Sequence, residues 1–214
     1  MKIRFSILII LLSIFLSGCI ELVEEIKINS DTSGSMTYTL EFNGISKIFS
    51  EVSRFTDTDW REQLENEAGK LVAQLQTKHG ISNIQFIRQN YTNNYELSFD
   101  FENTKYLNAA LYEMGGHEKS FFSPGYIKIK KHRFRRINFS PWVRKYLENE
   151  QIEIPLADDN GILFYKSIIH FPTTIKGISD KSVQISSDGK VATGKYDIQK
   201  ILKNEVKTGL KVKY

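Results

Sequence analysis

One cysteine and four histidines are the residues best suited to chemistry in this chain, and their spacing limits what they can do together. The histidines lie at positions 79, 117, 132 and 170, so no two of them have the spacing of metal ligands. The His-Glu-x-x-His pattern is absent, and Cys19 is the only cysteine. We therefore expect no metal centre, no cofactor and no disulfide within the chain.

Two further segments carry parts of functional motifs. Gly115-Gly116-His117-Glu118 combines flexible glycines with a histidine that titrates near neutral pH, and we interpret it as a helix end rather than a catalytic loop. Asp158-Asp159-Asn160-Gly161 begins like a calcium-binding loop but lacks the acid that closes such a loop, so we interpret it as a turn. Neither segment makes a case for an enzyme.

A basic stretch lies between residues 128 and 136. On one continuous strand its cations would lie on both faces, which indicates an edge strand or a protruding hairpin. Charged side chains on an edge prevent pairing with other chains, and this is one interpretation. The other is a contact for phosphate or carboxylate groups of membrane headgroups, a cell-wall polymer or an acidic partner, formed by Lys128, Lys130, Lys131, Arg133, Arg135 and Arg136.

The segment that precedes Cys19 has the parts of a secretory signal peptide. Lys2 and Arg4 form a cationic start, residues 5–16 are mostly apolar, and Ser17-Gly18 are small. The apolar run is shorter than the roughly 20 residues that a transmembrane helix needs. We therefore expect a signal peptide at residues 1–18 and a single folded domain at residues 19–214, with a possible sub-boundary near 115–125.

Leu16-Ser17-Gly18-Cys19 is similar to the bacterial lipobox. This resemblance implies that Cys19 receives a lipid, such as palmitate, and becomes the first residue of the mature chain. It also implies a lipoprotein of the bacterial cell envelope, in the outer membrane if the organism has one. Cleavage by the general signal peptidase, with Cys19 left as a free thiol, is the alternative.

The charge of the mature chain gives no support to nucleic acid as a partner. Removal of residues 1–18 takes away two of the 29 basic residues and none of the 25 acidic ones, which leaves a net charge near +2. Without disulfides, an exported domain of this length must take its stability from a hydrophobic core, and the chain is long enough to form one.

Alternating apolar residues predict strands at 20–29, 36–42, 82–88, 95–101, 126–137, 161–175, 182–186, 191–196 and 209–214. Helical spacing predicts helices at 45–55, from about 58 to Gly80, at 104–114, from Ser140 and at 198–206. The second helix carries an apolar stripe made of Leu64, Ala68, Leu71, Val72 and Leu75. Hairpins that alternate with helices predict an α+β fold, a mainly antiparallel sheet of hairpins packed with two to four helices.

The chain also resembles the LppM-type lipoprotein domain. The residues that carry this resemblance are Cys19, the turn from Asp31 to Gly34, Phe171-Pro172 and the turn Ser187-Asp188-Gly189. The resemblance implies a strand pair directly after the lipidated cysteine and a proline-marked strand near the end. It implies no catalytic residue.

Our leading hypothesis is a lipid-anchored envelope protein with a non-catalytic binding or assembly role. Its partners would be the membrane, through the lipid anchor, and another envelope protein or a cell-wall polymer. A carrier of a lipid or other apolar ligand is one alternative, and a hydrolase whose acids converge only in the fold is another. A deep pocket favours the carrier, whereas converging acids favour the hydrolase.

Replacement of Cys19 by serine removes the thiol that the lipid needs. Because several acyl chains together anchor a protein stably, we expect Cys19→Ser to appear in the soluble fraction or to remain an unprocessed precursor. Fractionation of cells that express the full chain, followed by mass determination of the N-terminus, measures both outcomes. A variant that stays in the membrane with a normally cleaved N-terminus would contradict lipidation.

Overall fold

The computed structural model describes residues 19–43, 60–89, 94–115, 123–141, 143–144 and 163–214 of this chain. These ranges form two β-sheets and the helices that cover them. Four of the expectations above lie outside the described residues: the signal peptide at 1–18, the helix at 45–55, the loop around His117 and the turn at 158–161.

The larger sheet, sheet A, has seven strands in the order β3-β4-β2-β1-β7-β10-β9. All neighbouring strands are antiparallel except β1 and β7, which run parallel. The strand β1 therefore lies at the centre of the sheet although it comes first in the described chain. The strands are β1 (Cys19–Ile28), β2 (Gly34–Asn43), β3 (Ile81–Arg88), β4 (Tyr95–Phe101), β7 (Leu163–His170), β9 (Gln184–Ile185) and β10 (Val191–Asp197).

The turn between β1 and β2 has the chemistry that its sequence predicts. The amide of Ser33 donates a hydrogen bond to Asp31 Oδ1 at 3.1 Å, which holds the turn closed. Gly34 is required at the start of β2, because a Cβ atom there would lie 2.0 Å from the carbonyl oxygen of Lys27. The turn and the glycine together favour one register between β1 and β2.

The smaller sheet, sheet B, has four antiparallel strands in the order β5-β6-β11-β8. They are β5 (Ile127–Lys130), β6 (Arg133–Arg136), β8 (Gly177–Ile178) and β11 (Leu210–Lys213). Burial alternates strictly along β5, β6 and β11, so one face of sheet B packs inward and the other faces solvent.

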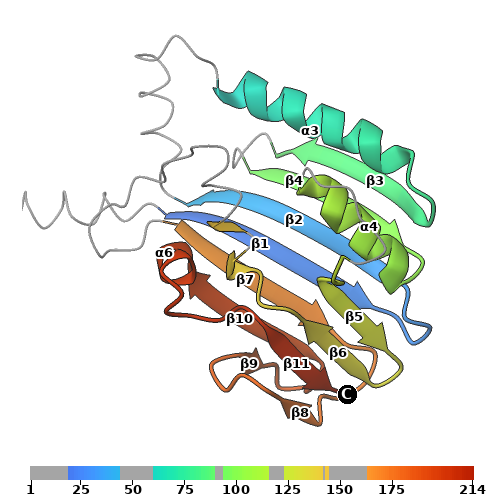
Figure 1. The fold of residues 1–214 in the computed structure, drawn as a ribbon, viewed down its shortest axis with the longest axis vertical. Coiled ribbons are helices and arrows are strands. Elements are labelled where there is room, and N and C mark those ends of the chain that lie inside the picture. The colour runs from blue at the N-terminus through green and yellow to red at the C-terminus, as the bar shows by residue number, and fades with distance from the viewer. Residues whose placement is uncertain (1–18, 44–59, 90–93, 116–122, 142, 145–162) are drawn as a thin grey trace, which may run out of the picture.

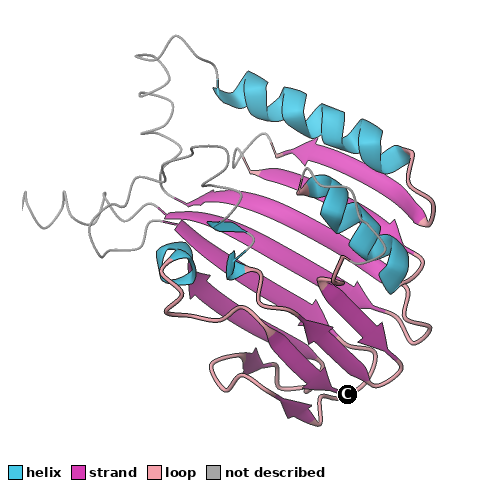
Figure 2. Ribbon diagram, in the orientation of Figure 1, coloured by secondary structure: helices cyan, strands magenta, loops and turns pink. Residues whose placement is uncertain are grey.

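The two longer helices, α3 (Trp60–Gln76) and α4 (Thr104–Met114), and sheet B cover the same face of sheet A (Figure 1). Helices α3 and α4 lie over the part that contains β3 and β4, and sheet B lies over the part that contains β7 and β10. Figure 2 shows this division between helices and strands in the covering layer. The short helix α6 (Ile198–Leu202) follows β10 directly and contacts β7. No described helix has the length and apolar character needed to span a bilayer.

The core lies between sheet A and this covering layer. Sheet A contributes Ile26, Met36 and Phe99, which are at most 1% exposed, and α3 and α4 contribute Leu75 and Leu107. Sheet B joins the same cluster through Ile127, Ile129, Phe134, Leu210 and Val212. One continuous core therefore includes residues on both sides of 115–125, where the sequence suggested a possible sub-boundary.

The predicted fold class is confirmed, as are most of the elements on which it was based. The helix at 104–114 has the predicted bounds, and Asn103 caps it by accepting hydrogen bonds from two amides of its first turn. The β-prone segments at 161–175 and 182–186 form shorter strands than expected. The stretch at 126–137 is a hairpin of two strands rather than one continuous strand.

The stripe of α3 is buried unequally, and this determines what truncation of each leucine should do. Leu75 is fully buried, whereas Leu71 is only half-buried. We expect Leu75→Ala to lower the free energy of unfolding by about 2–5 kcal/mol, and Leu71→Ala to lower it by less. Urea unfolding followed by circular dichroism measures both. Equal losses at the two positions would show that the phase of α3 against the core is wrong.

Candidate functional site

A buried ion pair joins the two sheets. Glu24 on β1 and Arg136 on β6 are 5% and 4% exposed, and Arg136 Nη1 lies 2.6 Å from Glu24 Oε1. The alternation of each strand brings the pair together, because Glu24 shares the inward face of β1 with Ile26, and Arg136 shares the inward face of β6 with Phe134. The pair therefore lies at the interface between the two layers.

Hydroxyl groups of sheet A complete the surroundings of this pair. Arg136 Nη1 donates to Tyr165 Oη at 2.7 Å and to Ser167 Oγ at 2.6 Å, both on β7. Tyr165 in turn donates to Glu24 Oε1 at 2.7 Å, and Tyr38 on β2 donates to Glu24 Oε2 at 3.2 Å. The carboxylate is therefore well supplied with donors, as a buried charge must be.

The protonation states in this network are fixed by burial and by the charges. Burial acts to lower the pKa of Arg136, but Tyr165 and Glu24 outweigh it, and the net direction is a pKa above the ordinary value. Burial raises the pKa of Tyr165 and, with a further contribution from Glu24, that of Tyr38. The guanidinium therefore stays charged and both tyrosines stay protonated donors.

One donor of the network is left over. The second terminal nitrogen of Arg136, Nη2, is buried and has no hydrogen-bond partner among the described residues. A buried donor without a partner costs roughly 1–3 kcal/mol, and more when it is charged. An external group with an oxygen acceptor that reaches Nη2 would remove this penalty.

Arg136 lines a cavity of about 530 Å³, which we call the arginine cavity. Its charged and hydroxyl groups come from Glu24, Tyr38, Arg136, Tyr126 and Tyr165, and the remaining walls are mostly apolar. A few polar groups in a mainly apolar enclosure of roughly 300–1,000 Å³ are typical of small-molecule sites. The apolar walls come from Leu22, Leu111, Met114, Ile127, Ile137, Phe139, Val143, Ile198 and Ile201.

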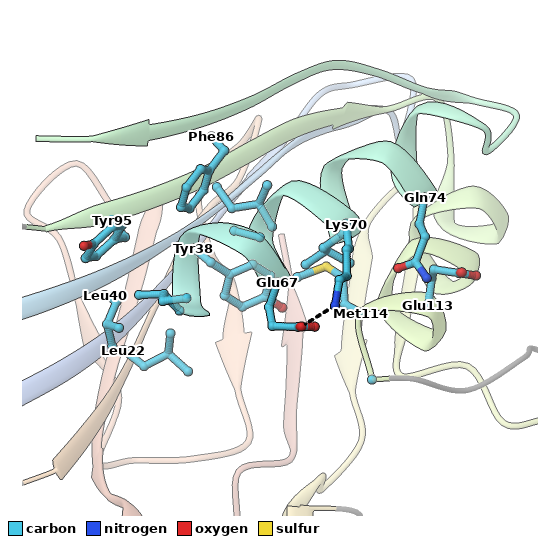
Figure 3. A pocket seen from close by; sticks show the side chains of 15 residues that line it. Leu22, Tyr38, Leu40, Glu67, Lys70, Gln74, Phe86, Tyr95, Glu113 and Met114 are labelled. Atoms are coloured by element: carbon cyan, nitrogen blue, oxygen red, sulfur yellow. Dashed lines mark hydrogen bonds and ion pairs between the residues drawn. The ribbon is translucent and has the colours of Figure 1, made fainter. Parts of the chain in front are cut away.

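A second cavity of about 630 Å³, which we call the helix cavity, lies between α3 and the inner face of sheet A (Figure 3). The exposed side chains of Glu67 and Lys70, paired at 2.6 Å, stand on α3 beside it. The two cavities adjoin, because both are lined by Leu22, Tyr38, Met114 and Gly115. The mainly apolar linings of the two cavities therefore lie next to each other, and the ion pair belongs to the arginine cavity.

The structure places the basic residues of the sequence in two different environments. The chain reverses at Lys131 and His132, so Lys128, Lys130, Arg133 and Arg135 lie on one exposed face rather than on two. The prediction that Arg136 belongs to this anion-binding surface needs correction. Its side chain is buried against Glu24 and is not available to an external anionic surface. Binding of such a surface by the exposed cations remains a prediction.

The three described histidines lie on different parts of the fold. His79 stacks on Tyr106 with ring centroids 4.7 Å apart, His132 lies in the β5–β6 turn, and His170 Nε2 lies 2.8 Å from Glu25 Oε1 without the alignment of a hydrogen bond. Among the described residues, no three His, Cys, Asp or Glu side chains form a cluster that could hold a metal ion.

Sequence reasoning missed both the ion pair and the cavities. A signal was present in the strand pattern, because Glu24 interrupts the apolar parity of Leu22, Ile26 and Ile28. Arg136 likewise shares parity with Phe134. Two opposite charges on the inward faces of separate strands are a candidate buried pair.

A double-mutant cycle tests whether the two charges act as one unit. Glu24→Leu alone leaves Arg136 buried without its counter-ion, so we expect a loss of about 3–5 kcal/mol in the free energy of unfolding. The double variant Glu24→Leu/Arg136→Met should lose less than Glu24→Leu alone, because no charge remains buried. Urea unfolding of the four proteins gives the coupling, and strictly additive losses would contradict a coupled pair.

No protein-family model matches the chain, and no curated protein sequence matches it either. Among solved structures, the chain is similar to the NMR structure of the folded domain of Mycobacterium tuberculosis LppM. The match has 11% sequence identity and a TM-score of 0.39, and it covers 92% of this chain and 91% of that domain. A likeness at this level supports no statement on activity or ligand.

Proposed function

We propose that this protein binds a lipid-like ligand in the arginine cavity and the adjoining helix cavity, as a non-catalytic carrier. The observation that carries the proposal is a mainly apolar cavity lined by Arg136, whose buried Nη2 has no hydrogen-bond partner among the described residues. The only buried carboxylate in this cavity, among the described residues, is Glu24, and it is already paired with Arg136. A pair of acids for hydrolysis is therefore not what the site offers.

The charges of the site favour an uncharged polar group on the ligand. The charge of Arg136 is balanced by Glu24, so an added anion would place a second negative charge beside a buried carboxylate. An ester, carbonyl or hydroxyl oxygen accepts a hydrogen bond from Nη2 without that repulsion. The ligand class is accordingly an acyl lipid. Its chain would pack against the apolar walls, and its neutral oxygen would accept a hydrogen bond from Arg136.

The position of the cavities along β1 agrees with an anchored protein. Leu22 lines both cavities and lies three residues after Cys19, which is about 10 Å along an extended strand. If Cys19 carries the lipid anchor, the cavities lie close to the membrane from which an acyl lipid would come. The proposal therefore includes the anchor: the protein would be a lipoprotein of the cell envelope.

Two fluorescent probes test the proposal: the methyl ester of a pyrene-labelled fatty acid and a pyrene-labelled alkane of the same length. All described contacts lie within residues 19–214, so the binding experiment uses the chain from residue 19 with the substitution Cys19→Ser. We expect the ester to bind about tenfold more tightly than the alkane, as one buried hydrogen bond allows. Arg136→Lys, which keeps the charge but removes Nη2, should abolish this preference.

A pair of matched tryptophan variants tests the location. Leu22→Trp fills the space between the two cavities and should weaken both probes at least about tenfold. Ile168→Trp makes a change of the same kind on the opposite face of sheet A and should leave binding unchanged. Thermal melting checks that both variants fold. Equal binding by parent and Leu22→Trp protein, or no binding of either probe by the parent, would contradict the proposal.

A further inference from the structure

Three of the four strands of sheet B present only cations on the outward face. All outward positions of β5, β6 and β11 are lysine or arginine, and all six side chains are exposed. No acidic residue occurs in any strand of sheet B. We call this surface the cationic face; it consists of Lys128, Lys130, Arg133, Arg135, Lys211 and Lys213.

The strand register arranges these cations in two rows. Lys128, Arg135 and Lys211 lie side by side across the three strands, and Lys130, Arg133 and Lys213 form the second row. Neighbours within a row are about 4.8 Å apart along the hydrogen-bonding direction, and the rows are about 7 Å apart.

Such a grouping is unfavourable in the free domain. Like charges that lie directly opposite each other on neighbouring strands repel. None of the six cations forms an ion pair with a carboxylate among the described residues. An external layer of anions would attract all six cations and offset the repulsion between them. The arrangement therefore favours an anionic ligand.

Protection of a sheet edge does not account for these charges. The outer edge of β5 is already closed by α4: Asn108 exchanges two hydrogen bonds with the backbone of Ile127, and the hydroxyl of Thr104 contacts the amide of Ile129 at 3.2 Å. The strands β6 and β11 are interior strands of sheet B and have no free edge. Four of the six cations therefore lie where no edge needs protection.

We propose that the cationic face binds the headgroups of an anionic phospholipid surface. None of its residues lines either cavity, so the surface is separate from the proposed ligand site. It carries no aromatic side chain on which a nucleic-acid base could stack, and its charges extend in two dimensions rather than along one groove. A membrane presents anions in the same two-dimensional way.

Vesicle co-sedimentation tests this interaction with the chain from residue 19 that carries Cys19→Ser. We expect binding to vesicles of phosphatidylglycerol and phosphatidylcholine, a decrease in binding as salt rises, and little binding to pure phosphatidylcholine. Each cation near an anionic bilayer contributes roughly fivefold to binding. The face variant Lys128→Gln/Lys130→Gln/Lys211→Gln/Lys213→Gln should therefore lose vesicle affinity by about several hundredfold.

The control variant changes four exposed lysines outside the face and alters the net charge equally: Lys181→Gln, Lys190→Gln, Lys200→Gln and Lys203→Gln. It should bind like the parent, and so should Leu22→Trp, which separates this surface from the cavities. Three results would overturn the proposal: no binding of the parent to anionic vesicles at low salt, an equal loss in the control variant, or binding of soluble polyglutamate as tight as vesicle binding. Melting temperatures confirm that each variant is folded.

Discussion

The contact between Glu24 and Arg136 is the constraint on which the arrangement of the two sheets depends. A buried ion pair adds little net stability, because the loss of hydration offsets the attraction, but a buried charge without its partner is strongly unfavourable. This asymmetry selects a register. If β6 were shifted by one residue, Arg133 and Arg135 would turn into the core and Phe134 would turn to solvent. In the observed register the one buried arginine of β6 has Glu24 as its counter-ion.

The strand β6 places its arginines in two different environments. On its inward side, β6 brings one guanidinium into an apolar space, where the surrounding hydroxyls and carboxylate determine its hydrogen bonds. On its outward side, arginines of the same chemistry are hydrated and lie among like charges. The identity of the side chain is thus the same at 133, 135 and 136, and burial alone determines whether it is part of an internal network or of an open surface.

The strand pattern was sufficient to predict the fold class, because alternation and helical spacing are local properties of the sequence. The helix at 104–114 shows this well, since its cap and apolar stripe lie within the segment itself. The cavity could not be predicted in that way, because its walls come from β1, β2, α4, β5, β6, β7 and α6, and only the topology brings them together. The cationic stretch was recognised from the sequence, but the turn at Lys131 and His132 makes it a hairpin, so its exposed cations lie on one face rather than two. Lys211 and Lys213 extend this face from a strand about 75 residues further along the chain.

The central position of β1 has a consequence for the order in which this protein can fold. Its first residues pair with β7 in parallel, with Ile20 opposite Leu163, so the middle of sheet A is completed only after most of the chain has been made. Pairing at such separation has a large loop-closure entropy and is slow. Until then the hairpin of β1 and β2 has an open edge along β1. The edge of β1 that pairs with β7 therefore stays open until residues 163–170 have been made.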